Sequence, residues 1–182
     1  MKKTFFLSTL VVAMAVMFSS CAVNLNGVTA RYNPMNNYFV NNNFQNGTHK
    51  LVIHNQRDFE SVFGMAAVMG RNGQPTNIDF NRQFVIAIIL PETDYQTGVE
   101  TVMLNRDGNR LYYSYMIHRG HRTSYNIRPF AAVVVDRSEP SDVIFQEVTV
   151  SDLEKAGIRY NGNYNYNNPT NTTGGTARPP IP

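Results

Sequence analysis

Near its middle the chain reads Phe84-Val85-Ile86-Ala87-Ile88-Ile89-Leu90, a run that is continuously apolar and rich in β-branched residues. A short apolar run of this composition is typical of a strand that is buried on both faces. Pro91 follows directly and ends the strand, because proline cannot donate to a β-ladder. The run therefore predicts the central strand of a sheet that is covered on both sides.

Further strands are predicted on either side of this run. Asp107-Gly108 is a strong hairpin signal between two apolar stretches, residues 99–105 and 110–118. In the second arm one set of alternating residues, Leu111, Tyr113, Tyr115 and Ile117, shares one face, and Tyr112, Ser114 and Met116 share the other. Residues 51–53, 130–135 and 143–150 supply three more strands.

Helices are predicted near the two ends of this region. Asn55 is a candidate N-cap with Asp58 at the third helical position, and apolar residues at 59, 62, 63 and 66 predict an amphipathic helix that ends at Gly70. Ser151 with Glu154 predicts a capping box for a brief second helix closed by Gly157. We expect a mostly β (α+β) domain, a single antiparallel β-sandwich or curled sheet with one N-terminal amphipathic helix.

The N-terminus has the features of a secretory signal. Two lysines follow Met1, residues 5–18 are predominantly apolar, and Ser19-Ser20 precede Cys21, the single cysteine of the chain. Residues 18–21 resemble the lipobox of bacterial lipoproteins, with Phe18 where that family more often has Leu. The resemblance implies removal of residues 1–20, acylation of Cys21, and attachment through membrane lipid. An ordinary secretory signal with an unpaired thiol, or an uncleaved anchor, is the alternative.

The composition of the two flanks differs from that of the middle. Residues 21–47 are rich in asparagine and predict a polar tether, although their aromatic residues would also suit an added edge strand. Residues 159–182 contain Asn, Tyr, Gly and Pro and predict a disordered tail. The folded domain is expected over residues 48–158. Removing Lys2 and Lys3 lowers the formal charge from +3 to +1, so net charge does not favour nucleic acid as a partner.

A family resemblance covers roughly residues 50–137. It is carried by Ile53-His54-Asn55-Gln56-Arg57-Asp58-Phe59-Glu60, by Ile78-Asp79-Phe80-Asn81-Arg82-Gln83 before the apolar run, and by Pro129-Phe130-Ala131-Ala132-Val133-Val134. Together these resemble the C-terminal domain family of the PrcB protease-complex subunit. Where many members have a Gly-Gly-Tyr loop, this chain has residues 91–99. The resemblance implies a small β-rich secreted or lipid-anchored module that associates with a protease, and it transfers no catalytic residue.

The candidate binding residues lie in two predicted loops. Asp94 and Tyr95 follow the central strand, and a basic stretch contains His118, Arg119, His121, Arg122 and Tyr125. Guanidinium and phenol groups together suit carboxylates on a protein partner or a polyanionic glycan. An ordinary exposed loop is the alternative. A metal site at the two histidines is disfavoured by the neighbouring arginines and by the lack of further ligands.

No motif for catalysis is present in the sequence. Neither Gly-x-Ser-x-Gly nor a glycine-rich phosphate loop occurs, and the spacing of the acidic residues selects no carboxylate pair. We therefore expect a non-enzymatic cell-envelope lipoprotein without a cofactor. Ala22 after the cysteine favours the outer membrane over retention in the inner membrane. We expect this lipoprotein to bind another protein. The resemblance implies a protease as the partner, which the lipoprotein would stabilise or inhibit. A glycan- or polyanion-binding surface lipoprotein, and then a minor hydrolase, are the alternatives.

Overall fold

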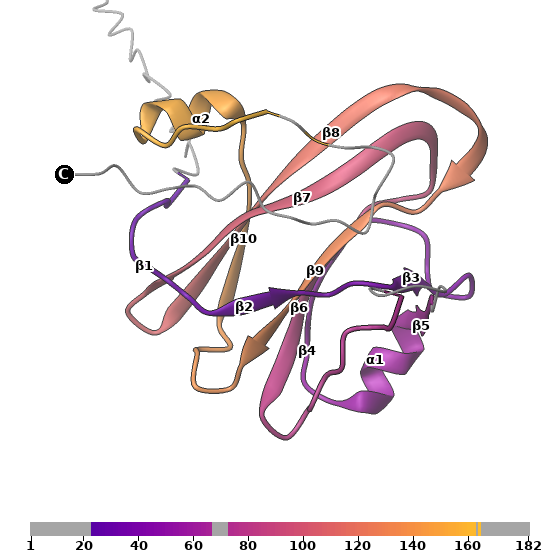
Figure 1. Ribbon diagram of the computed structural model, residues 1–182, viewed down its shortest axis with the longest axis horizontal. Helices are drawn as coiled ribbons and strands as arrows, with labels where there is room; N and C mark the ends of the chain where they lie inside the picture. The colour runs from indigo at the N-terminus through magenta and orange to yellow at the C-terminus, as the bar shows by residue number, and fades with distance from the viewer. Residues whose placement is uncertain (1–22, 67–72, 163, 165–182) are drawn as a thin grey trace, which may run out of the picture.

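Two four-stranded sheets pack face to face in the computed structural model, which describes residues 23–66, 73–162 and 164 (Figure 1). A two-stranded sheet and two short helices complete the described part. The elements, in chain order, are β1 (Val28–Thr29), β2 (Tyr32–Pro34), β3 (Tyr38–Val40), β4 (His49–Ile53), α1 (Gln56–Val62), β5 (Phe63–Met65), β6 (Gln83–Ile89), β7 (Thr93–Asp107), β8 (Arg110–Ile127), β9 (Phe130–Asp136), β10 (Val143–Glu147) and α2 (Val150–Lys155).

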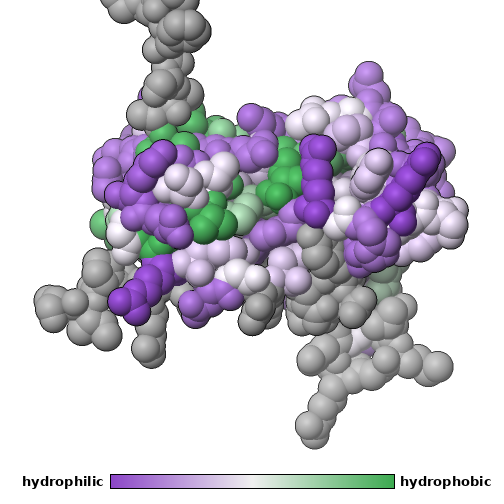
Figure 2. Space-filling view, turned by 90° about the horizontal axis from the view of Figure 1, so that it is seen from above, coloured by the Kyte–Doolittle hydropathy of each residue, from purple (hydrophilic) through white to green (hydrophobic). Residues whose placement is uncertain are grey.

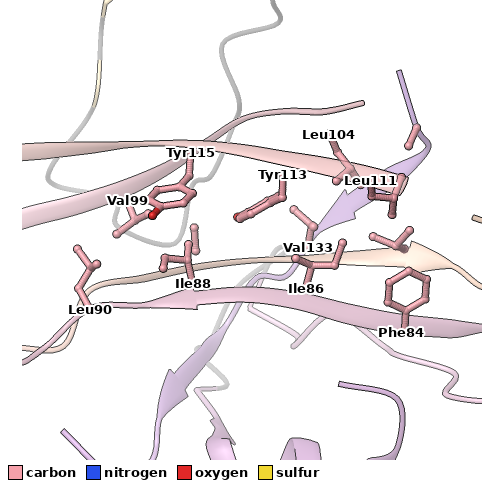
Figure 3. Packing of buried hydrophobic residues seen from close by; sticks show 13 residues of the cluster. Phe84, Ile86, Ile88, Leu90, Val99, Leu104, Leu111, Tyr113, Tyr115 and Val133 are labelled. Carbon is pink, nitrogen blue, oxygen red and sulfur yellow. The ribbon is translucent and has the colours of Figure 1, made fainter. Parts of the chain in front are cut away.

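The apolar run forms β6, which lies between β9 and β4 in a sheet of order β2-β9-β6-β4. Phe84, Ile86 and Ile88 point toward the second sheet and belong to a cluster that we call the inner core (Figure 3). Val85, Ala87 and Ile89 point to the other side, into a helix-side core beneath α1, β3 and β5. The predicted central strand with two covered faces is confirmed.

The second sheet has the order β1-β7-β8-β10 and is built on one long hairpin. Asp107 pairs with Arg110, so the two-residue turn is Gly108-Asn109, and Gly108 adopts a left-handed φ of 59°. The predicted alternation along β8 is confirmed, because Leu111, Tyr113 and Tyr115 are buried in the inner core. Both arms are longer than the sequence pattern predicts, and β10 pairs with β8 in parallel, so the sandwich is not purely antiparallel.

The expected tether is wrong for residues 28–40, which form three strands. β1 pairs with β7, β2 with β9, and β3 with β5. Hydrophobic burial is the physical reason: Met35, Tyr38 and Val40 all lie in the helix-side core. The alternative of added strands at the sheet edges is the one that the structure adopts.

Both predicted helices need correction at one end. Asn55 caps α1 as expected, its side chain accepting a hydrogen bond from the Asp58 amide, but α1 ends at Val62 rather than at Gly70. Phe63 begins β5, which pairs with β3. The cap of α2 is Thr149 with Asp152, in place of Ser151 with Glu154. Gly157 closes α2 with a positive φ, as expected.

The outer face of the second sheet carries a third cluster, the outer core. It consists of Val102, Met103, Met116, Val148 and Leu153, against which Val23, Leu25, Ile158 and Tyr160 pack. This cluster therefore includes residues from both expected flanks. Residues 1–20, Cys21 and residues 165–182 lie outside the described residues, and none of the described helices has the length and hydrophobicity needed to cross a bilayer.

Candidate functional site

The end of the hairpin opposite its turn forms an arm, which we define as residues 93–97 of β7 and 118–127 of β8. The register shifts twice here, between Thr93 and Tyr95 and again between Tyr95 and Thr97. Such bulges bend a ribbon and redirect its side chains. No arm residue is among the described members of the three core clusters, and the exposed side chains of the arm include Tyr95, Arg122 and Tyr125, whereas Thr97 at its base is buried.

All of the predicted binding residues except His118 have side chains on the surface of the arm or its flank. Tyr95 is 48% exposed and Tyr125 is 61% exposed. The Arg122 Nε donates to the Asp94 carboxylate at 2.6 Å, and Arg119 and His121 are exposed. The predicted loop at residues 118–125 is wrong, since these residues continue strand β8. The reason is cross-strand pairing with β7, which a local sequence pattern does not reveal.

A cavity of about 230 Å³ lies at the base of the arm. Its walls come from β3, β7, β8, the β8–β9 connection and the C-terminal segment: Tyr38, Gln96, Thr97, Gly98, Val99, Tyr125, Ile127, Arg128, Pro129, Phe130 and Tyr164. Tyr125 is the one predicted binding residue among them. The other aromatic walls were missed, because Tyr38, Phe130 and Tyr164 are far apart in sequence and meet only in the fold.

Arg128 holds one side of this cavity in place. Its guanidinium donates to the backbone carbonyls of Asn41, at 3.2 Å, and of Phe44, at 2.7 Å. These bonds tie the β8–β9 connection to the loop after β3. The cavity wall is therefore supported by hydrogen bonds to backbone and does not depend on flexible side-chain pairs.

His118 does not join the other predicted residues but turns to the outer face of the second sheet. Its Nε2 lies 2.8 Å from a Glu100 carboxylate oxygen, and the Tyr160 hydroxyl donates to the same oxygen. Glu100 is only 6% exposed. Burying a carboxylate is costly unless hydrogen bonds compensate, and these two partners provide them. The pKa of the Tyr32 hydroxyl is raised, mainly by the burial of Tyr32 itself and to a smaller extent by the negative charge of Glu100.

Tyr164 covers the imidazole of His118. The two rings are stacked, with centroids 4.3 Å apart and planes inclined by 15°. Gly98, the cross-strand partner of His118, leaves room for this ring, because a Cβ built at Gly98 would overlap Tyr164. The imidazole and the carboxylate are thus both engaged in contacts with the C-terminal segment, an arrangement suited to holding aromatic side chains.

Metal ligation has no support in the described ranges, where no three His, Cys, Asp or Glu side chains gather. Comparisons of the chain with protein-family models, with curated proteins and with solved structures found no match. The function proposed below therefore depends on the geometry of the arm, the cavity and the surface around His118.

Proposed function

We propose that this protein is a lipid-anchored protein of the bacterial cell envelope that binds a partner protein through the arm and the adjoining cavity. Residues 1–20 act as the signal peptide, and Cys21 carries the acyl chains that hold the protein at the outer membrane. The role is non-enzymatic. A secreted or envelope protease is the partner class that the sequence resemblance favours, with this chain as a stabilising or inhibitory subunit.

One observation carries this proposal: two tyrosines, Tyr95 and Tyr125, are exposed on an arm that contributes nothing to the described core clusters. Tyrosine buries a large apolar ring and keeps a polar hydroxyl, and it is enriched among the residues that dominate binding interfaces. Tyr125 also walls the cavity, which has the size to accept a side chain of a partner. The arm thus offers an anchor and a pocket side by side.

The charged residues of the arm define what surrounds this anchor. The Arg119 and His121 side chains are exposed and make no hydrogen bond or ion pair within the described part of the chain, whereas Arg122 is paired with Asp94. Exposed charges at the rim of an interface steer association and contribute modestly to affinity. A partner segment with an apolar or aromatic side chain flanked by carboxylates would match both features.

The test is crosslinking of the tagged full-length protein in cells, followed by purification and identification of attached proteins. We expect one stoichiometric envelope protein. Tyr125→Ala, alone or with Tyr95→Ala, should reduce its recovery at least about thirtyfold, the effect of losing an interface residue worth roughly 2 kcal/mol. Ile144→Ala on β10, where Ile144 is 37% exposed, is the matched control and should retain the partner.

Two results would contradict the proposal. If the tyrosine variants keep every partner and unfold at the same temperature as the natural protein, the arm is not the binding surface. If Cys21→Ser stays in the membrane fraction and incorporates radiolabelled palmitate as the natural protein does, Cys21 is not the residue that carries the lipid.

A glycan or polyanion is the second candidate ligand, and the exposed guanidinium of Arg119 favours it. Exposed tyrosines also stack on sugar rings. This candidate predicts retention on immobilised heparin that falls with salt and with Arg119→Ala. Arg57→Ala, which removes an exposed arginine on α1, should leave retention unchanged. Salt-sensitive retention without any captured protein would replace the first candidate by the second.

A further inference from the structure

The C-terminal segment, residues 158–164 as far as they are described, crosses the outer face of the second sheet after α2. Ile158 and Tyr160 pack against the outer core, and Tyr164 reaches the wall of the cavity. The segment thus connects the helix to the proposed binding site. Its two tyrosines both meet the same small surface, formed by Gly98, Glu100 and His118, which we call the ring site.

Each element of the ring site matches a part of a tyrosine side chain. Glu100 accepts the Tyr160 hydroxyl, His118 offers a flat face to the Tyr164 ring, and Gly98 leaves the space that this ring fills. The Tyr160 ring is also nearly parallel to the His118 imidazole, inclined by 16° at a centroid distance of 6.4 Å. A hydrogen-bond acceptor, an aromatic face and a strand position without a side chain are the features of a phenol-binding site.

The backbone at Gly98 does not itself require glycine. Gly98 is not among the residues with a positive φ, so an alanine would fit the strand conformation. A Cβ there would instead collide with the Tyr164 ring. Glycine is therefore needed at this position to make room for the Tyr164 ring, and the backbone conformation does not require it.

We infer that the ring site is a receptor for a peptide segment bearing two tyrosines in the spacing Tyr-x-x-x-Tyr, and that the chain's own residues 160–164 occupy it in cis. Because Tyr164 also walls the cavity, this occupancy sets the shape of the proposed partner site. The effect of Tyr164 on partner binding rests on the function proposed above. The existence of the receptor does not depend on that function.

The receptor is tested with a fluorescein-labelled peptide, Ile158-Arg159-Tyr160-Asn161-Gly162-Asn163-Tyr164, added to the full-length protein. A tethered segment competes at an effective concentration of the order of millimolar, so the natural protein should bind the peptide weakly. The variant Tyr160→Ala/Tyr164→Ala has an empty receptor and should bind it at least about tenfold more tightly. Fluorescence anisotropy measures both affinities.

Two controls make the result specific. A peptide with both tyrosines replaced by alanine should not bind, and adding Gly98→Ala to the double variant should abolish binding of the original peptide. Equal binding by the natural protein and the double variant, no binding by a double variant that still melts cooperatively, or binding that survives Gly98→Ala would each overturn the inference.

A second measurement does not depend on the double variant. In the natural protein the stacked Tyr164 ring shifts the proton resonances of the His118 imidazole, and Gly98→Ala should move them by ejecting that ring. The resonances of His49 and His54 should stay in place. If Gly98→Ala leaves the His118 resonances unchanged, the ring site does not hold Tyr164. Partner capture by Tyr164→Ala then tests whether the occupied ring site shapes the cavity, and we expect capture to change. Unchanged capture would show that Tyr164 does not affect the partner site, and it would leave the receptor and the proposed function standing.

Discussion

Tyr113 is fully buried in the inner core, and its hydroxyl lies 2.7 Å from the hydroxyl of Thr101. Removing one partner of a buried hydrogen bond leaves the other unsatisfied. Tyr113→Phe should therefore lower the free energy of unfolding by about 1 to 2 kcal/mol. Urea denaturation measures the change, and Tyr95→Phe on the exposed arm is the control.

The pair can be tested further by removing both hydroxyls. Tyr113→Phe/Thr101→Val leaves no buried polar group without a partner, so its cost should be smaller than the sum of the two single costs. Strict additivity would contradict the bond between Tyr113 and Thr101.

The same tyrosine makes the protein sensitive to alkali. Burial raises the pKa of Tyr113 well above its ordinary value of 10.0, and burial also raises the pKa of Tyr32 and Tyr115. Above pH 10 the unfolded chain loses these protons first, so unfolding is favoured as the pH rises. We expect the free energy of unfolding to keep its full value below pH 10 and to decline above it. Unfolding monitored by circular dichroism as a function of pH measures this decline. In Tyr113→Phe the decline should be shallower, and an unchanged slope would contradict this assignment.

The residues of β8 show what local sequence can and cannot predict. The alternation of Leu111, Tyr113 and Tyr115 places these side chains correctly, because a strand has a period of two whatever its neighbours are. The basic stretch of the sequence groups His118 with Arg119 and Tyr125, but the His118 side chain contacts Glu100 and Tyr164, which lie on other segments. Contacts between distant segments leave no local pattern, so the ring site was not predicted.

At the scale of elements, α2 offers a test of which residue caps it. The Thr149 hydroxyl accepts from the Asp152 amide, and the Asp152 carboxylate accepts in return from the Thr149 amide. Thr149→Ala should therefore destabilise the protein by about 1 kcal/mol, the usual cost of losing an N-cap. Ser151→Ala removes the hydroxyl that the sequence pattern favoured, and it should have almost no effect in thermal unfolding. A larger destabilisation by Ser151→Ala than by Thr149→Ala would contradict the assignment of Thr149 as the N-cap.

The capping box also has a pH dependence of known sign. The hydrogen bonds from the Thr149 side chain and backbone lower the pKa of Asp152 in the folded protein. The resulting stabilisation is present above the ordinary pKa of the carboxyl and is lost as the pH falls through the lower folded value. In Thr149→Ala the free energy of unfolding should fall less steeply as the pH is lowered through this range. Ser151→Ala should keep the pH dependence of the natural protein.

Elements were predicted well where one local signal decides them and poorly where pairing decides them. Asn55 caps α1 as its sequence indicates, because an N-cap depends on residues three positions apart. Phe63 has helical spacing to Phe59, yet it forms β5 because β3 pairs with it there. The same competition explains the arm, since pairing with β7 extends β8 to Ile127.

At the scale of the whole molecule, the N-terminal segment belongs to the fold. Val23 and Leu25 pack on the outer core beside α2, and the Asn24 amide donates to the Gln146 side chain at 2.6 Å. Cys21 lies two residues before Val23 in the sequence, a span of at most about 7 Å. If Cys21 is acylated as proposed, the α2 side of the sandwich is held close to the membrane.

In Figure 1 α2 lies at the upper left and the arm lies at the right, at the far end of β7 and β8. The face seen from above mixes hydrophobic with hydrophilic surface (Figure 2). Because Cys21 is the single cysteine, an added thiol would be unique once Cys21 is acylated. We expect a spin label at Val150→Cys, a site 41% exposed at the start of α2, to be relaxed by lipid-soluble oxygen in vesicles more than a label at Tyr125→Cys.

A flexible linker of about ten residues inserted after Ala22 provides the control, since it lengthens the connection to roughly 17 Å or more and should remove the difference between the two labels. With the short natural connection, we expect Tyr95 and Tyr125 to lie farther from the lipid than α2 and to be open to a partner. Equal relaxation of both labels in the protein without the linker would show that the anchor does not orient the domain. The arm would then have to reach its partner by free rotation above the membrane.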